Sequence, residues 1–134
     1  MSNKTLLDLC HKSFDSICHT KGNHWGLDIS TTIFFDGNGM AFHLQQVEPK
    51  TLKIHTDQSF WEWLAYATLD VGCYHEEIKT VARRFGVAWD EQKLELSITF
   101  RRNEMTISQA YFRLAQVVGI VGNFRHYIHF KNKP

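Results

Sequence analysis

The sequence predicts a single α+β domain, residues 1–134, in which helices pack on one face of a mostly antiparallel sheet of four or five strands. Residues 36–39 (DGNG) join two runs of alternating apolar and polar residues, a pattern typical of a β-hairpin. Elsewhere, apolar residues recur at spacings of three and four, which indicates amphipathic helices. These observations predict the element order α-β-β-β-α-α-β-β-α.

The first predicted helix spans about residues 5–20, and Gly22 would end it. Its apolar stripe consists of Leu6, Leu7, Cys10, Phe14, Ile17 and Cys18. The hairpin follows, with apolar residues at alternate positions of both strands. One face of the hairpin carries Leu27, Ile29, Thr31, Ile33 and Phe35 from the first strand, and Met40, Phe42, Leu44 and Gln46 from the second. A third strand, residues 51–55, would complete a meander.

The second half of the sequence predicts three helices and two strands. A short aromatic helix over residues 59–67 begins after Thr56 and Asp57, whose side chains can cap it. The next helix carries the stripe Ile78, Val81, Ala82 and Phe85 and ends at Gly86. Two strands, residues 87–89 and 94–100, precede the longest helix, residues 106–121. Residues 124–134 alternate basic and aromatic residues and are expected to form an edge strand or an irregular tail.

Net charge, cysteine content and hydropathy limit the partners and the compartment expected for this protein. The 15 basic and 14 acidic residues give a net charge of +1, so no overall field attracts nucleic acid or an anionic membrane. The 3 cysteines have no framework spacing, which indicates reduced thiols. The sequence lacks both an apolar run long enough to span a bilayer and a signal-peptide pattern at its start. We therefore expect a soluble cytoplasmic protein without membrane contact.

Several stretches resemble the family of small bacterial and phage domains called domain of unknown function 1828. They are residues 31–34 (TTIF), 36–39 (DGNG), 54–59 (IHTDQS), 83–87 (RRFGV), 94–96 (LEL) and 110–118. The resemblance covers about residues 29–124. It departs from the family pattern at Thr32, where proline is usual, and at Gln58 and Ser59, where the family carries a glycine. What the resemblance implies is a prophage or mobile-element context.

One alternative is a Mg²⁺-dependent nuclease of the PD-(D/E)xK type. Asp36, Glu48 and Lys50 resemble its two metal-binding carboxylates and the lysine beside the attacking water. Pro49, however, occupies the middle of a triplet that should lie inside a central strand, where proline removes a hydrogen-bond donor. Ordinary solvated charges in a polar turn are the favoured interpretation.

The cysteines and histidines do not form a convincing zinc site or catalytic pair. The Cys-His pairs at residues 10–11 and 18–19 lie about 12 Å apart along a helix, too far to share one zinc ion. To act as a catalytic nucleophile, Cys73 would need a nearby histidine as base. We favour the interpretation that it is a packed loop residue. His43 and His55 are expected on one sheet face as a solvated patch. We expect no cofactor and no metal.

The leading prediction is therefore a non-enzymatic binding protein of phage or prophage type. It would dock on a host protein or nucleoprotein complex, as an inhibitor of a defence system that targets nucleic acid. The candidate docking residues are Trp61, Trp63, Arg101, Arg102, Arg125 and Tyr127. Trp61 and Trp63 lie about 200° apart on a helix, so both cannot face one core centre.

Two further alternatives concern partners. The basic and aromatic tail suits contact with nucleic acid, because Arg125 can pair with a phosphate while Tyr127 stacks on a base. A homodimeric regulatory module would equally explain an exposed tryptophan at the surface of the aromatic helix.

Overall fold

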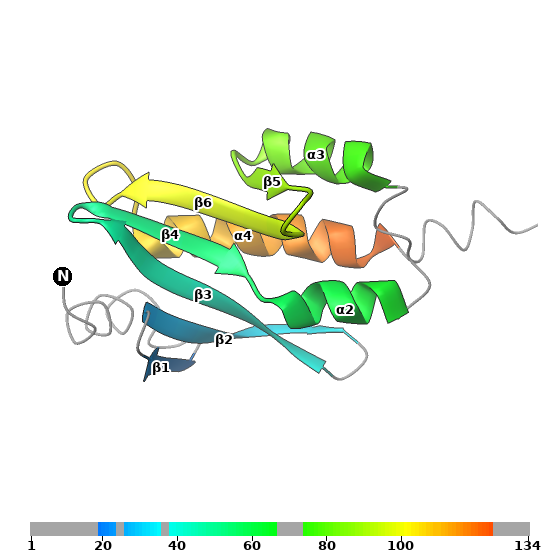
Figure 1. Cartoon of the computed structure of the whole chain (residues 1–134), viewed down its shortest axis with the longest axis horizontal. Helices are drawn as coiled ribbons and strands as arrows, with labels where there is room; N and C mark the ends of the chain where they lie inside the picture. Colours follow the sequence, from blue (N-terminus) through cyan, green and yellow to red (C-terminus); the bar gives the residue numbers. More distant parts are fainter. Residues whose placement is uncertain (1–18, 24–25, 36–37, 67–73, 125–134) are drawn as a thin grey trace, which may run out of the picture.

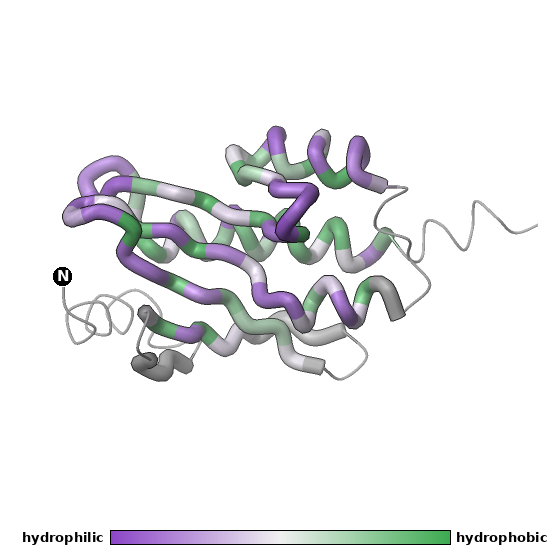
Figure 2. The backbone as a smooth tube through the Cα atoms, in the orientation of Figure 1, coloured by the Kyte–Doolittle hydropathy of each residue, from purple (hydrophilic) through white to green (hydrophobic). Residues whose placement is uncertain are grey.

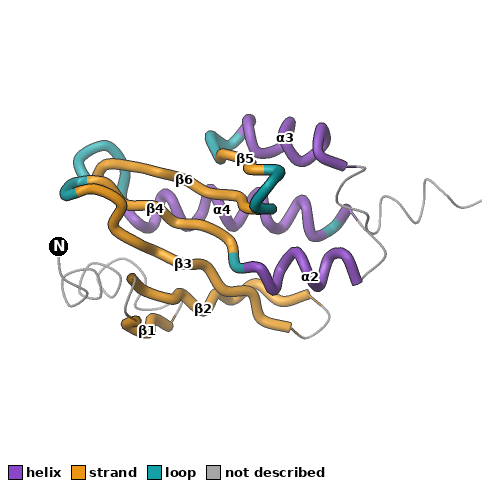
Figure 3. Tube along the Cα trace, in the orientation of Figure 1, coloured by secondary structure: helices purple, strands orange, loops and turns teal. Residues whose placement is uncertain are grey.

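The computed structural model describes residues 19–23, 26–35, 38–66 and 74–124 (Figure 1). These residues form one six-stranded sheet and three helices, which confirms the predicted α+β class. The strands are β1 (His19–Asn23), β2 (Gly26–Phe35), β3 (Asn38–Glu48), β4 (Thr51–Thr56), β5 (Ala88–Asp90) and β6 (Glu95–Arg101). The helices are α2 (Gln58–Tyr66), α3 (His75–Arg84) and α4 (Ile107–Gly122), and Figure 3 distinguishes strands from helices by colour.

All neighbouring strands of the sheet are antiparallel, in the order β1-β2-β3-β4-β6-β5. The predicted meander is confirmed as β2, β3 and β4, and β6 joins it at the free edge of β4. The hairpin is also confirmed, since Phe35 pairs with Asn38 across residues 36–37, which lie outside the described residues. The pairing shifts register between Ser30 and Phe34.

The strand β1 corrects the sequence prediction. Thr20 was expected in the first helix and Gly22 at its end, but both belong to a strand that pairs with β2. This strand has no apolar alternation of its own (HTKGN), so the open edge of β2 determines its conformation. The remainder of the predicted first helix lies outside the described residues.

The core lies between the inner face of the sheet and the helices. Figure 1 shows α4 running behind β4 and β6, and Figure 2 shows the alternation of hydrophobic and hydrophilic residues along the strands. The strands contribute Leu27, Ile29, Met40, Phe42, Leu44, Leu52, Ile54, Leu96, Ile98 and Phe100 to the core. The helices contribute Phe60, Trp61, Leu64, Ile78, Ala82, Ile107, Ala110, Tyr111, Leu114, Val117, Val118 and Val121. No described helix is long and apolar enough to cross a membrane.

Local side-chain chemistry sets the helix boundaries. The α4 helix begins after Thr106, whose hydroxyl accepts from the Gln109 N–H at 3.1 Å, while the Gln109 side chain accepts from the Thr106 N–H at 3.0 Å. This capping box satisfies two backbone donors that would otherwise lack partners. Gly86 follows α3 with φ of 68°, a conformation that favours glycine. Leu94 also has a positive φ, of 52°, so β6 begins one residue later than predicted.

Candidate functional site

The outer face of the sheet carries a row of polar side chains around His43. Alternation along the strands places Asp28, His43, His55 and Ser97 at matching positions of β2, β3, β4 and β6. We call this surface the outer face; it consists of Asp28, His43, Gln45, Lys53, His55, Glu95, Ser97 and Thr99. All three described helices pack on the opposite, inner face, so no described element covers it (Figure 1).

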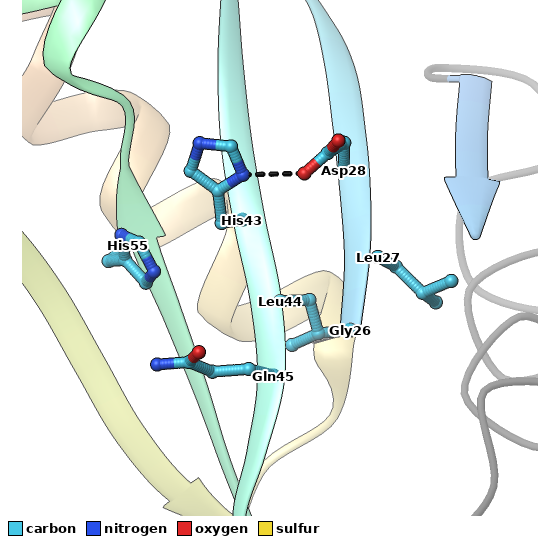
Figure 4. Close-up of a pocket in the computed structure, with 7 residues that line it drawn as sticks. All are labelled: Gly26, Leu27, Asp28, His43, Leu44, Gln45 and His55. Atoms are coloured by element: carbon cyan, nitrogen blue, oxygen red, sulfur yellow. Dashed lines mark hydrogen bonds and ion pairs between the residues drawn. The ribbon is translucent and has the colours of Figure 1, made fainter. Parts of the chain in front are cut away.

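His43 lies between two carboxylates. Its Nδ1 is 2.6 Å from Asp28 Oδ1, drawn as a dashed line in Figure 4, and its Nε2 is 2.5 Å from Asp57 Oδ1. An ionised carboxylate only accepts hydrogen bonds, so both ring nitrogens can donate to these carboxylates when the ring is protonated to an imidazolium. Burial alone would lower the pKa of His43, but the hydrogen bonds and charges of Asp57 and Asp28 outweigh it and raise the pKa above 6.5.

Asp57 connects this cluster to the start of α2. Its second oxygen, Oδ2, accepts from the Ser59 N–H at 3.0 Å and also from the Ser59 hydroxyl. Burial alone would raise the pKa of Asp57, but the hydrogen bonds from Ser59 and His43 lower it. One carboxylate therefore caps a helix and orients an imidazolium on the sheet.

His55 has a different environment, although its ring centroid lies 5.2 Å from that of His43. Its Nδ1 is 2.9 Å from the Thr56 carbonyl oxygen and 3.2 Å from Glu95 Oε1, so Nδ1 is the donor. Burial lowers the pKa of His55, aided by the charges of His43 and Lys53, against the effect of Thr56 and Glu95. A neutral His55 carries its lone pair on Nε2 and can accept a hydrogen bond there.

Lys53 completes the polar row beside His55. Its Nζ lies 2.8 Å from Glu95 Oε2, in an ion pair whose side chains are 20% and 16% exposed. Glu95 thus contacts both Lys53 and His55 from the neighbouring strand β6. The outer face therefore combines opposite charges that hold one another in position.

A shallow pocket of about 240 Å³ lies on the outer face (Figure 4). It is lined by Gly26, Leu27, Asp28, His43, Leu44, Gln45 and His55. Gly26 has a φ of 153°, and an added Cβ would collide with the Leu44 carbonyl oxygen, so the lack of a side chain at this position lets the two backbones approach closely. Pockets for drug-sized ligands are typically about 300–1,000 Å³, so this pocket is smaller than the usual range for such ligands.

The structure places the predicted docking residues in three environments. Trp61 is only 2% exposed, and its Nε1 donates to Thr56 Oγ1 at 3.1 Å, so it is a core residue and its prediction as a docking residue is wrong. Trp63 is half-buried and stacks on Phe60. Arg101 and Arg102 are exposed at the end of β6. Arg125 and Tyr127 lie outside the described residues.

The nuclease residues lie on a turn. Glu48 ends β3, and Pro49 and Lys50 form the turn into β4, where all three are exposed. The Gln46 amide donates to the Pro49 carbonyl oxygen at 3.0 Å across this turn. The triplet is therefore not within a central strand, as the nuclease interpretation requires, and Asp36 lies outside the described residues. Among the described residues, no group of three or more His, Cys, Asp or Glu could hold a metal ion.

The remaining sequence candidates have mixed outcomes. His43 and His55 share one face of the sheet, as predicted. Cys73 and most of the two Cys-His pairs lie outside the described residues. The two aspartates that hold His43 were missed as site residues, although the alternation from Leu27 already places Asp28 on the polar side of β2.

Comparison with known proteins gives no relative for this arrangement. No protein-family model, no curated protein and no solved structure matches the chain. The resemblance to domain of unknown function 1828 therefore stays a prediction, and the interpretation of the site depends on its own geometry.

Proposed function

We propose that this protein is a non-enzymatic binding protein of phage or prophage type that docks on a host protein or nucleoprotein complex. In this proposal it acts in the cytoplasm and inhibits a defence system directed at nucleic acid. Docking uses the outer face of the sheet. The observation that carries the proposal is the Asp28–His43–Asp57 cluster, a set of charges fixed on a surface that no described element covers. The resemblance to a phage-associated family supports the context.

Fixed charges favour docking because binding then orders fewer side chains. Each member of the cluster is already held by hydrogen bonds, and Lys53 and Glu95 hold one another beside it. Ordering a mobile side chain at an interface costs roughly 0.5–1.5 kcal/mol, a cost that such a surface largely avoids. The neutral His55 adds an acceptor among these charges.

The same geometry disfavours the other functions. Both nitrogens of His43 already donate to carboxylates, so this histidine is a positioned cation and not a general base. Asp28, Asp57 and Glu95 outnumber the cations His43 and Lys53 here, and carboxylates repel phosphates. The outer face therefore suits a protein surface with polar and basic groups. Contact with nucleic acid would have to come from elsewhere.

The proposal is tested by binding with two matched substitutions. Thr99 is exposed on the outer face and Thr80 is exposed on α3, so Thr99→Arg and Thr80→Arg make the same change at two sites. The purified variants are used to capture proteins from lysate of a bacterium that carries defence systems, and the captured partner is then purified and titrated. We expect Thr99→Arg to weaken binding at least tenfold and Thr80→Arg to leave it unchanged.

Two results would contradict the proposal. Unchanged affinity for Thr99→Arg and for the cluster variant Asp28→Asn, with both variants folded, would remove the outer face as the docking surface. Absence of any saturable partner, together with unaltered phage infection of defence-carrying cells that express the protein, would remove the function itself.

A further inference from the structure

The outward side of α4 is unusually apolar for a surface helix. Three large hydrophobic residues of the described chain are exposed: Phe112 (51%), Val47 (45%) and Ile120 (40%), and two of them belong to α4. Between Phe112 and Ile120, Arg113 and Gln116 are exposed and Ala115 and Gly119 are half-buried. Exposed apolar surface that gathers on one element marks an interaction site more often than single exposed residues do.

Charge is also nearly absent from α4. Arg113 is the single charged residue of its 16. Its Nη1 would lie 3.4 Å from a Cβ added at Gly86, so its guanidinium is directed towards the loop after α3. Arg113 is exposed, but it lies about 100° or more around the helix from Phe112, Ala115 and Gly119, so the side formed by these three residues carries no charge of its own.

The spacing of these residues makes the surface complementary to itself. Phe112 and Gly119 are seven residues apart, which places them about 10.5 Å apart along one side of the helix. A Cβ added at Gly119 would have no atom within 4 Å, so the space above this residue is open. The large side chain of Phe112 thus lies one turn before Ala115 and Gln116, and the open position at Gly119 lies one turn after them.

We propose that α4 forms the interface of a homodimer, in which two copies of the helix pack antiparallel about a twofold axis near Ala115 and Gln116. In this arrangement Phe112 of each copy lies over Gly119 of the other. The contact is isologous, because the same residues are used by both subunits.

A second copy is favoured over another partner by the distribution of charge. At a twofold axis each charged residue approaches its own copy, so a self-pairing surface must carry few charges near the axis. The outward side of α4 meets this condition. The neighbouring helix α3 does not, because it carries Glu76, Glu77, Lys79, Arg83 and Arg84.

The size of the surface predicts a weak dimer. A helix of 16 residues is about 24 Å long, and a pair of such helices buries less than the roughly 800 Å² per partner of a standard interface. We therefore expect dissociation on the order of micromolar concentrations. The outer face of the sheet points away from α4, so both copies of the outer face stay accessible in the dimer.

The test is the mass of the full chain in solution as a function of concentration. Sedimentation or light scattering from about 1 to 200 µM should show the mass rise from one chain towards two, consistent with micromolar dissociation. Phe112→Glu should weaken association at least tenfold, because it places two carboxylates near the axis. Val47→Glu makes the same kind of change at the exposed apolar residue of β3 and should leave the dimer intact.

A pair of variants tests the proposed register. Gly119→Lys alone should also weaken association, because it fills the open position beneath the second copy's Phe112. Mixing Phe112→Glu with Gly119→Lys should restore a mixed dimer, since the new carboxylate then meets the new ammonium. Restoration supports the antiparallel arrangement, and a mixture that stays monomeric overturns it.

Two outcomes overturn the dimer as a whole. One is a wild-type chain that stays monomeric at the highest concentration. The other is a loss of thermal stability on Phe112→Glu at a low concentration where the wild type is monomeric, because this side of α4 would then be covered within one chain.

Discussion

The two faces of the sheet are made from alternate residues of the same strands, yet different interactions hold their side chains. On the inner face Leu44, Ile54 and Ile98 are buried against helices, and their burial is non-directional. On the outer face His43 and its neighbours are partly exposed and held by hydrogen bonds of fixed geometry. If the outer face docks on a partner as proposed, stability and recognition belong to opposite sides of one strand.

Side chains on the two faces contribute different amounts to the free energy of unfolding. Burying one large aliphatic side chain contributes about 1.5–3 kcal/mol, whereas a partly exposed ion pair contributes about 0–1 kcal/mol. Substitutions on the outer face should therefore change binding more than folding, and those on the inner face should do the reverse.

The largest expected effect comes from the inner face. Ile54 is fully buried, so Ile54→Ala should lower the free energy of unfolding by about 2–5 kcal/mol through lost burial and an unfilled cavity. Urea denaturation measures this change. Lys53→Ala, one residue away on the outer face, is the control and should cost about 1 kcal/mol or less. Equal costs for the two variants would show that the faces do not divide these roles.

An intermediate effect is expected at Asp57, which serves both the helix and the outer face. Asp57→Ala removes the cap of α2 and one partner of His43, and should lower the unfolding free energy by about 1–2 kcal/mol. Asp57→Asn keeps an oxygen for the cap but loses the charge, so it should cost less. Chemical denaturation of both variants separates the two roles. A larger cost for asparagine than for alanine would be inconsistent with this division.

The smallest effect is a pH dependence of opposite sign at the two histidines. The pKa of His43 is raised in the folded state, so its stabilisation is complete below about pH 6.5 and lost as pH rises through the raised value. The pKa of His55 is lowered, so its stabilisation is present above about pH 6.5 and lost as pH falls through the lowered value. Asp57 stays ionised over this window, because its pKa is lowered.

This prediction is checked by measuring the unfolding free energy of wild type, His43→Gln and His55→Gln between about pH 5 and 9. The difference between wild type and His43→Gln should decrease with rising pH. The difference between wild type and His55→Gln should increase as pH rises from the lowered pKa of His55 to about 6.5. Changes in the same direction for both variants would mean that the two histidines share one environment.

Much of the fold could be predicted from the sequence because local chemistry marks its boundaries. Residues 36–39 indicate the hairpin, Asp57 and Thr106 cap helices, and Gly86 ends one. The strand β1 could not be predicted, because its residues carry no alternating pattern and its conformation comes from pairing with β2. The helical pattern of α2 also does not determine which of its two tryptophans faces the core. Trp61 is held there by a hydrogen bond to Thr56, which lies in β4 and not in the helix.

The candidate site was harder to predict because it depends on register. Counting outward from the pair of Phe35 and Asn38 places Asp28 opposite Gln45. The register shift between Ser30 and Phe34 moves Asp28 opposite His43 instead. An irregularity of this kind has no distinct signal in a single sequence. The contact between Asp57 and His43 likewise requires the position of α2 against the sheet.

The position of Thr56 has a consequence for the order of folding. Its hydroxyl oxygen accepts from Trp61, 5 residues away, and from the Leu96 N–H, 40 residues away. Closing a short loop loses less chain entropy than closing a long one, and folding slows as contacts become more distant in sequence. We expect the hairpins from β1 to β4 and the first turn of α2 to form early. The addition of β6 to β4 would then be the slow step that completes the native sheet.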